Sequence, residues 1–161
     1  MPNPRTFVYI DGFNLYYRAV KSTPYKWLNI GALCSHLLAR NDILKIKYFT
    51  ALVDGKGDPD RPNRQQLFLR ALRTIPNFEI ILGQFSSHTY TMPLANPKPG
   101  QSRYAEVIRT EEKGSDVNIA AHLIHDAHTG KYDVGVLISN DSDLAEPLRI
   151  IIAQEPSNWT A

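Results

Sequence analysis

The most specific chemical signal in the sequence is a pair of aspartates that follows an apolar run. Asp141 and Asp143 flank Ser142 soon after residues 132–138, a run whose lack of polar alternation is typical of a strand buried on both faces. In open α/β sheets, ligands bind beyond the carboxyl ends of the strands, so both acids lie where chemistry is usually found. On an extended backbone the two side chains would face the same way. Such close carboxylates resist joint ionisation unless a cation lies between them.

Two further aspartates, Asp11 and Asp116, occupy comparable positions. Asp11 follows the apolar residues 7–10, and Gly12 would allow the tight turn that such a site needs. Asp116 lies in the first turn of the predicted helix 115–128, where the helix dipole favours a negative charge and would keep this carboxylate ionised at neutral pH. Taken alone, the first could be an Asx turn and the second an ordinary helix cap. Together with the pair above, they lead us to expect carboxylates gathered around a divalent metal.

An all-oxygen ligand set of this kind favours Mg²⁺ or Mn²⁺, hard cations that keep several waters and bind a few carboxylates plus substrate phosphates. Zinc is disfavoured because Cys34 is the only cysteine and because His122 and His125 lie on the polar side of their predicted helix, which we interpret as a solvated face. A bound metal would activate water and offset charge on an in-line phosphoryl transition state. The predicted reaction is therefore hydrolysis without a protein nucleophile.

Polar residues beside the aspartates would complete the site. We assign Asn14 to orienting a ligand water or a phosphate oxygen, and Ser139 to a hydrogen bond with a phosphate or a metal-bound water. Ser139 could equally satisfy backbone groups where its strand ends. Lys113 would bring a cation close to a phosphate just before the following helix, and Asn118 lies two residues beyond Asp116.

The charge distribution is more informative than the net charge of +2, which says little about partners. Between residues 61 and 105 the only acid is Glu79, whereas the same segment carries these basic residues: Arg61, Arg64, Arg70, Arg73, Lys98 and Arg103. A positive middle beside an acidic cluster is what a phosphodiester-binding surface needs. A solvated helix face followed by a loop would produce the same pattern, so both interpretations stay open.

The chain of 161 residues is long enough for one full hydrophobic core and too short for two, so we expect a single domain spanning 1–161. Its amino terminus lacks the apolar core of a signal peptide, and no apolar run approaches the length of a membrane span. A single cysteine excludes an intrachain disulfide and fits a reducing compartment. We expect a soluble, cytoplasmic protein with no membrane association.

Predicted strands alternate with predicted helices along most of the chain. The strands are expected at 6–10, 43–53, 78–85 and 132–138, and the helices at 14–21, 30–40, 63–74, 115–128 and from about 142 onwards. Lys45 and Lys47 would alternate outward at the start of the second strand. The alternation implies βαβ units, hence an α/β fold with a mainly parallel sheet. Residues 86–113, with three prolines between β-prone pieces, are expected to form a hairpin arm.

Three ordered segments, 11–14, 113–118 and 139–144, resemble the NYN domains, the LabA-like branch of the PIN-like nuclease superfamily. The resemblance spans residues 5 to about 152. It implies a three-layer α/β/α PIN-like (Rossmann-like) fold with a central, mainly parallel sheet, and a Mg²⁺- or Mn²⁺-dependent endoribonuclease that binds RNA. It also implies an acidic metal centre with polar neighbours, formed by Asp11, Asp116, Asp141, Asp143, Asn14 and Ser139.

The chain departs from the family pattern at several positions. Asn140 stands where family members often have glycine, and Leu144 where they often have an aromatic residue, changes that should leave the ligands in place. After residues 150–152 the family usually continues through a glycine turn into another strand, whereas residues 153–161 have the composition of an irregular tail. A final edge strand would then be missing, or be supplied by a partner such as a second copy in a homo-oligomer.

Two functional hypotheses of different classes follow. The first is a metal-dependent endoribonuclease, which the intact set of acids favours. The second is a non-catalytic NYN-fold module that binds RNA or protein in a regulatory role. In either case RNA would contact the basic residues Arg61, Arg64, Lys98 and Arg103, with Tyr90 and Tyr104 either stacking on bases or packing the hairpin.

Two other enzyme families also place an aspartate after a strand. Phosphatases of the haloacid dehalogenase type usually need a second aspartate two residues after the first, where this chain has Phe13. A Toprim-like site pairs its Asp-x-Asp with a glutamate after the first strand, where this chain has Asp11. Both resemblances therefore lack a residue that their chemistry requires.

Overall fold

A mixed sheet of five strands organises the protein, whose computed structural model describes residues 2–100 and 102–154. The spatial order is β4-β3-β2-β1-β5. The strands are β1 (Arg5–Asp11), β2 (Asp42–Ala51), β3 (Phe78–Pro93), β4 (Tyr104–Lys113) and β5 (Val134–Ile138). β1 pairs in parallel with β2 and with β5, β2 pairs in parallel with β3, and only the β3–β4 pair is antiparallel. The predicted α/β class with a mostly parallel sheet is confirmed, and the sheet is mixed.

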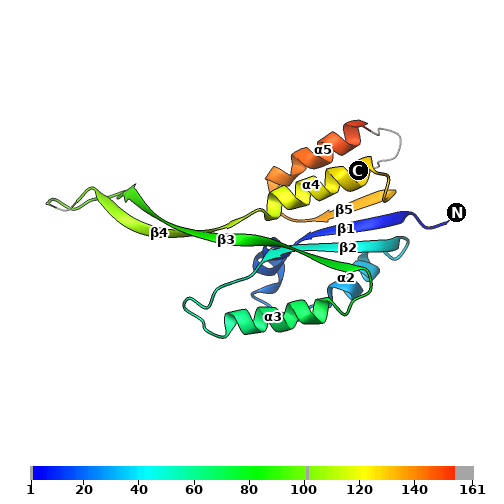
Figure 1. The fold of residues 1–161 in the computed structure, drawn as a ribbon, viewed down its shortest axis with the longest axis horizontal. Helices are drawn as coiled ribbons and strands as arrows, with labels where there is room; N and C mark the ends of the chain where they lie inside the picture. Colours follow the sequence, from blue (N-terminus) through cyan, green and yellow to red (C-terminus); the bar gives the residue numbers. More distant parts are fainter. Residues whose placement is uncertain (1, 101, 155–161) are drawn as a thin grey trace.

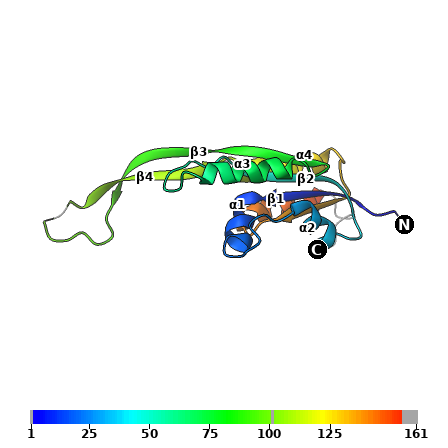
Figure 2. The same ribbon diagram turned by 90° about the horizontal axis from the view of Figure 1, so that it is seen from below.

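The helices lie on both sides of this sheet. They are α1 (Gly12–Leu15), which continues into the π-helical turn η1 (Tyr16–Val20), α2 (Ile30–Leu37), α3 (Arg61–Leu72), α4 (Ser115–His128), the 3₁₀ turn η2 (Ser142–Leu144) and α5 (Ala145–Gln154). α4 and α5 cover one side, and α1, α2 and α3 lie on the other (Figures 1 and 2). Among the described residues, every helix is too short or too polar to cross a membrane.

The central strand β1 supplies the core on both sides of the sheet. Because successive side chains of a strand point to opposite faces, Tyr9 packs toward α4 with Ile119, while Ile10 packs toward α2 and α3 with Leu69. All these side chains are fully or almost fully buried. β1 is therefore the strand that is buried on both faces.

The strand predicted to be buried on both faces, β5, is instead an edge strand. All five of its residues are only partly buried, because only β1 lies beside it among the described residues. The tail expected at 153–161 begins as helix, since α5 reaches Gln154, and residues 155–161 lie outside the described residues. An apolar run without alternation thus matches a partly covered edge strand as well as a central one.

A long antiparallel ribbon projects from the sheet, in the segment for which we expected a hairpin arm. β3 runs far beyond its predicted end at residue 85, because its first part pairs with β2 and its second part pairs with β4. Ten residue pairs, from Gln84–Lys113 to Pro93–Tyr104, make up the ribbon. At about 3.4 Å per residue its length is about 30 Å. Figure 1 shows it extending well past the helices.

A buried charged cluster joins β2 to α4. Lys47, predicted to point outward, is only 5% exposed, and its ammonium forms an ion pair with the fully buried Asp126. The Lys47 Nζ also lies 2.9 Å from Nδ1 of His122, which is half-buried and not on the predicted solvated face. Asp126 accepts further hydrogen bonds from the Tyr9 hydroxyl at 2.8 Å and from Lys131 Nζ at 2.9 Å. Both predictions fail for one reason: α4 covers the sheet face that carries Lys47.

We expect Asp126→Asn to destabilise the protein strongly. Burial alone would raise the pKa of Asp126, but hydrogen bonds from Lys131, Lys47 and Tyr9 outweigh burial and lower that pKa below its usual value. Removing the carboxylate leaves the Lys47 ammonium buried without its counter-charge, a change that costs about 3–5 kcal/mol in comparable pairs. Urea unfolding followed by circular dichroism measures the loss. Asp133→Asn, which breaks an exposed ion pair with Arg5, is the matched control and should change stability much less.

The same cluster predicts a loss of stability in mild acid. Burial, and then the charge of Lys47, lower the pKa of His122 below its ordinary value of 6.5, so the unfolded chain takes up a proton first as the pH falls. Stability should therefore decrease as the pH falls through about 6.5 toward the lower folded value, and Asp126 adds a second loss below about 3.8. His122→Gln should remove the first loss and keep the second. Equal pH profiles for the two proteins between pH 7 and 5 would contradict this assignment.

Candidate active site

The site lies where the sheet changes direction, between β1 and β5. From β1 the chain proceeds through β2 and β3 on one side and later returns to place β5 on the other, so this is a topological switch point. The register aligns Ile10 with Ile138. Asp11 and Ser139 come next on these neighbouring strands, and the Ser139 hydroxyl donates a hydrogen bond of 3.0 Å to Oδ2 of Asp11. Residues separated by most of the chain therefore meet because their strands are parallel and in register.

Asn14 joins the two halves of this site. The Asp11 carboxylate caps α1 by accepting a hydrogen bond of 2.9 Å from the Asn14 backbone N–H. The side-chain oxygen of Asn14 in turn accepts a 2.9 Å hydrogen bond from the backbone N–H of Asn140. Asn14, predicted to orient a water or a phosphate oxygen, thus has its carbonyl oxygen engaged in holding the loop after β5 against the start of α1.

Asp141 and Asp143 lie in a hydrogen-bonded turn and not on an extended strand. β5 ends at Ile138, and the Asp141 N–H donates a hydrogen bond of 3.1 Å to the Ser139 hydroxyl. The Asp143 N–H donates one of 2.9 Å to Oδ1 of Asp141, which caps the 3₁₀ turn η2. The prediction of an extended backbone through both acids is wrong, because this Asx turn begins a helix immediately.

Asp116 is reached through a left-handed turn at Gly114. Gly114 has a φ of 99°, a conformation that glycine adopts without strain, and it takes the chain from β4 directly into α4. Burial, and next the charges of Asp11, Asp141, Glu112 and Asp143, raise the pKa of Asp116 above its usual value. This direction is opposite to the one expected from the helix dipole alone.

An open pocket of about 360 Å³ lies between these elements. Asp11, Asn14 and Asp116 line it, and the other lining residues are Phe13, Tyr17, Arg18, Arg61, Phe85, Glu112 and Ser115. We call it the acidic pocket. Asp141 and Asp143 are not among its lining residues. Their charges nevertheless act on the Asp116 carboxylate.

Glu112 is a site residue that the sequence did not reveal. Its carboxylate accepts hydrogen bonds from the Ser115 hydroxyl at 2.9 Å and from the Ser115 N–H at 3.3 Å, which brings a further acid to the acidic pocket. An acidic side chain directly before the 113–118 segment was the only available signal. Because Glu112 lies at the end of a predicted arm, the sequence does not distinguish it from an ordinary surface glutamate.

The acids fit a hard divalent cation by their chemistry, although their arrangement is not that of a preformed metal site. Among the described residues, no group of three or more histidine, cysteine, aspartate or glutamate side chains is arranged to hold a metal ion. The ligand atoms on offer are carboxylate oxygens, which Mg²⁺ and Mn²⁺ prefer. Desolvation raises the pKa of Asp116, and repulsion by the neighbouring acids raises it further; a bound cation would relieve that repulsion.

The remaining predicted residues do not form one basic surface with the acids. Lys113 forms an ion pair with Glu111 on the ribbon, Arg64 forms one with Asp58, and Asn118 is half-buried in α4. Only Arg61, of the basic residues named for RNA, lines the acidic pocket.

Lys98 and Arg103 lie in the connection between β3 and β4, at the far end of the ribbon, and Tyr90 and Tyr104 are exposed along it. The length of the ribbon separates Lys98 and Arg103 from the acids, and the sequence alone does not reveal this separation. The basic middle of the sequence is therefore divided between α3 and the ribbon.

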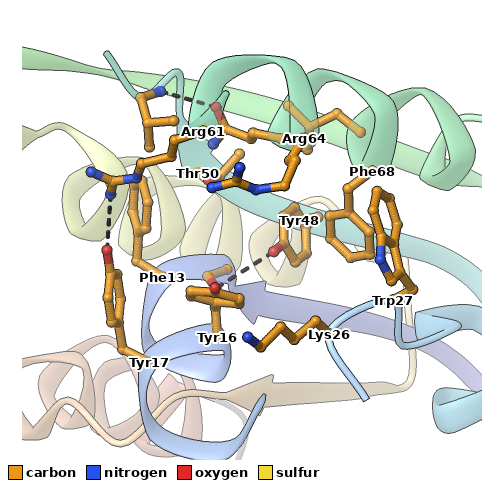
Figure 3. A pocket seen from close by; sticks show the side chains of 14 residues that line it. Phe13, Tyr16, Tyr17, Lys26, Trp27, Tyr48, Thr50, Arg61, Arg64 and Phe68 are labelled. Atoms are coloured by element: carbon orange, nitrogen blue, oxygen red, sulfur yellow. Dashed lines mark hydrogen bonds between the residues drawn. The ribbon is translucent and has the colours of Figure 1, made fainter. Parts of the chain in front are cut away.

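A second pocket, of about 180 Å³, adjoins the first on the side of α3 (Figure 3). Its walls are mainly aromatic, and we call it the aromatic pocket. The rings come from Phe13, Tyr16, Tyr17, Trp27, Tyr48 and Phe68. Sequence analysis did not single out this group, because its members come from segments that meet only in the folded protein.

The chain belongs to the NYN domain family, whose family model matches residues 5–154. This is a family of PIN-like nucleases, which typically use divalent metal ions. The resemblance stated from the three sequence motifs is thereby confirmed.

Two individual proteins resemble the chain. It is 33% identical over 174 aligned residues to 6-hydroxy-3-succinoylpyridine 3-monooxygenase HspA of Pseudomonas putida (strain DSM 28022 / S16), an alignment that covers 92% of this chain and 56% of that protein. The chain thus spans little more than half the length of this relative. The crystal structure of VPA0982, a protein of unknown function from Vibrio parahaemolyticus RIMD 2210633, has a similar fold, with a TM-score of 0.59 and 19% identity over 96% of this chain and 78% of that chain.

We expect Asp116→Asn to stabilise the metal-free protein. A raised folded pKa means that ionising Asp116 is less favourable in the folded state than in the unfolded state, so this carboxylate destabilises the fold at neutral pH. The amide removes the charge, and thermal unfolding at pH 7 in EDTA should show a higher Tm. Asp42→Asn, at the opposite end of the sheet, is the control and should leave Tm nearly unchanged. An unchanged or lower Tm for Asp116→Asn would show that the acids do not repel one another as described.

Proposed function

We propose that this protein is a metal-dependent endoribonuclease that hydrolyses RNA phosphodiester bonds. The acids Asp11, Asp116, Asp141 and Asp143 would hold Mg²⁺ or Mn²⁺. The observation that carries the proposal is that Asp11, Glu112 and Asp116, from three different elements, line one pocket. The raised pKa of Asp116, caused by desolvation and then by the charges of Asp11, Asp141, Glu112 and Asp143, agrees with this gathering of acids. Membership of a nuclease family and the location at a switch point support the same conclusion.

The bound cation would supply an activated water and would offset negative charge on the phosphate that is attacked. Residues of the protein would position the acids and the substrate phosphate. Ser139 holds Asp11 in place, and the Asn14–Asn140 hydrogen bond holds the loop that carries Asp141. Arg61, at the edge of the acidic pocket, would attract the substrate phosphate. Among the described residues the carboxylates of Asp116 and Asp143 make no hydrogen bond, so their oxygens would be available to a cation.

Cleavage of RNA should depend on a divalent metal and on Asp116. Single-stranded and structured RNA, incubated with Mn²⁺, should be cut internally, and EDTA should abolish the cutting. Asp116→Asn should reduce the rate at least about a hundredfold, the scale on which removing a preorganised charge from an active site acts. Because Asp116→Asn is expected to fold more stably, lost activity cannot be attributed to unfolding.

Two results would count against the enzyme. Cleavage that survives both Asp116→Asn and Asp141→Asn would indicate a contaminating nuclease. No cleavage under any metal condition, together with retained RNA binding, would favour the alternative of a non-catalytic NYN-fold regulatory module. As a readout independent of turnover, Mn²⁺ should raise the Tm of the unmodified protein more than that of Asp141→Asn, because a ligand that binds only the folded state stabilises it.

A second candidate function is the binding of a small aromatic acid. The Pseudomonas putida relative is named for a succinoylpyridine, which combines a heteroaromatic ring with an acyl chain that ends in a carboxyl group. The aromatic pocket, with Lys26, Arg61 and Arg64 among its lining residues, has the chemistry that such a compound requires. The relative is nearly twice as long as the shared segment, so we do not extend its monooxygenase activity to this chain.

A further inference from the structure

The aromatic pocket lies next to the acids that are proposed to bind the metal. Its floor includes Gly12, the residue after Asp11, and a Cβ at that position would lie 2.5 Å from Cζ of Tyr48. Glycine therefore lets the Tyr48 ring lie against the start of α1. The ring of Tyr48 in turn contacts that of Phe68, at 6.5 Å between centroids, and Phe68 contacts Trp27 at 6.1 Å. A continuous aromatic wall results (Figure 3).

The opposite wall comes from the first helical segment. Tyr16 and Tyr17 stand where α1 widens into the π-helical turn η1, a local irregularity that is frequent at functional sites. Their rings meet edge to face at 5.2 Å, and both remain partly exposed, at 37% and 45%. Trp27, across the pocket, is 59% exposed. Large aromatic side chains left this accessible around one cavity are available to stack on a flat ligand.

The positive charges around the aromatic pocket favour binding of an anion. Lys26, Arg61 and Arg64 line it, and within the part of the chain that the structure describes no aspartate or glutamate does. Figure 3 shows both arginines reaching over the pocket from α3. Arg61 donates one hydrogen bond to the Tyr17 hydroxyl at 2.9 Å, and Arg64 also pairs with Asp58. Since a guanidinium has five N–H donors, each arginine keeps donors for a phosphate or carboxylate.

A buried hydroxyl offers a polar contact inside the pocket. Thr50, on β2, is only 3% exposed and is one of the lining residues. Among the described residues its hydroxyl has no hydrogen-bond partner. Buried polar groups normally have one, so a ligand atom that donates or accepts a hydrogen bond would complete this site. Gln65 cannot serve in the same way, because its amide is already bonded to the backbone of Val53 and Ala51.

The two pockets share a wall. Phe13, Tyr17 and Arg61 line both the aromatic pocket and the acidic pocket. A base bound in the aromatic pocket would therefore place its phosphate at Arg61, next to the acids. Unstacked bases of single-stranded RNA bind aromatic side chains in this way, with the phosphodiester close to the base.

We infer that the aromatic pocket binds one unstacked nucleobase of the RNA substrate, with the phosphate of that nucleotide on Arg61 and Arg64. This inference rests on the proposed nuclease function and names the substrate as single-stranded RNA. The ring of the base lies between the two walls of the pocket, one formed by Trp27 and Phe68 and the other by Tyr16 and Tyr17. The Thr50 hydroxyl bonds to the edge of the base.

Trp27 provides a direct probe of the pocket. Trp27 and Trp159 are the only tryptophans, so Trp159→Phe leaves Trp27, in the pocket, as the single tryptophan, which is excited at wavelengths where tyrosine does not absorb. Titrating this variant in EDTA with adenosine, cytidine, guanosine and uridine 5′-monophosphates should give saturable quenching for at least one nucleotide. The matching nucleoside, which lacks the phosphate, should bind at least about tenfold more weakly, as expected for losing a charge-assisted hydrogen bond.

Arginine variants test the geometry. Arg61→Gln and Arg64→Gln, in the same background, should each weaken nucleotide binding about tenfold. Arg70→Gln, an exposed arginine on the same helix that does not line the pocket, is the matched control and should bind nucleotides like the parent. Circular dichroism checks that all three variants are folded. Equal effects at the three positions would indicate only general attraction to a basic helix, and would overturn the proposal.

The remaining outcomes separate this inference from the proposed function. Absence of quenching by every nucleotide overturns the base pocket even if the protein cuts RNA. Saturable quenching in EDTA supports the pocket even if no cleavage is found, because the assay needs neither metal nor turnover. Quenching by 6-hydroxynicotinate, a hydroxypyridine carboxylate, without quenching by any nucleotide would overturn the nucleotide assignment and favour the small aromatic acid.

Discussion

The hydrogen bond between Ser139 and Asp11 marks the constraint on which the site depends: the parallel, in-register pairing of β1 with β5. Because Ile10 and Ile138 are paired, the residues that follow them emerge side by side at the same edge of the sheet. The loop after β5 is then fastened a second time, by the side chain of Asn14. A shift of one residue in this register would turn every β5 side chain to the opposite face and separate the acids.

The acidic pocket and the buried cluster around Asp126 handle charge in opposite ways. Asp126 is surrounded by donors from Lys47, Lys131 and Tyr9, so its negative charge is offset within the fold and adds to stability. Asp116 faces further acids, so its charge is not offset and its pKa is raised. A protein keeps such an arrangement at the expense of stability, and functional sites are where perturbed pKa values of this kind concentrate. The contrast between two aspartates of one helix, α4, distinguishes a structural acid from a candidate catalytic one.

In the proposed nuclease, the aromatic pocket would contact a part of the substrate other than the phosphate. Gly12 and Phe13, the first residues of α1, follow Asp11 directly and line the aromatic pocket. The junction of β1 and α1 therefore separates the acidic pocket from the aromatic pocket. The ribbon extends in another direction and carries the exposed Tyr90, Tyr104 and Arg103. One of its acids, Glu111, pairs with both Lys113 and Arg109, so part of the ribbon's positive charge is offset.

The sequence by itself determined the local structure at the site, though not the end of β3. Apolar runs and turn residues placed Asp11 and Ser139 where strands end and Asp116 in the first turn of a helix, because these features depend on neighbours in the chain. Only the tertiary structure decided that Lys47 is buried, that β5 lies at an edge and that Lys98 stands far from the acids. It also brought Trp27 and Phe68 together beside Gly12. The physical reason is that burial and proximity depend on which helix covers which face of the sheet, and a one-dimensional pattern of polar and apolar residues does not contain that choice.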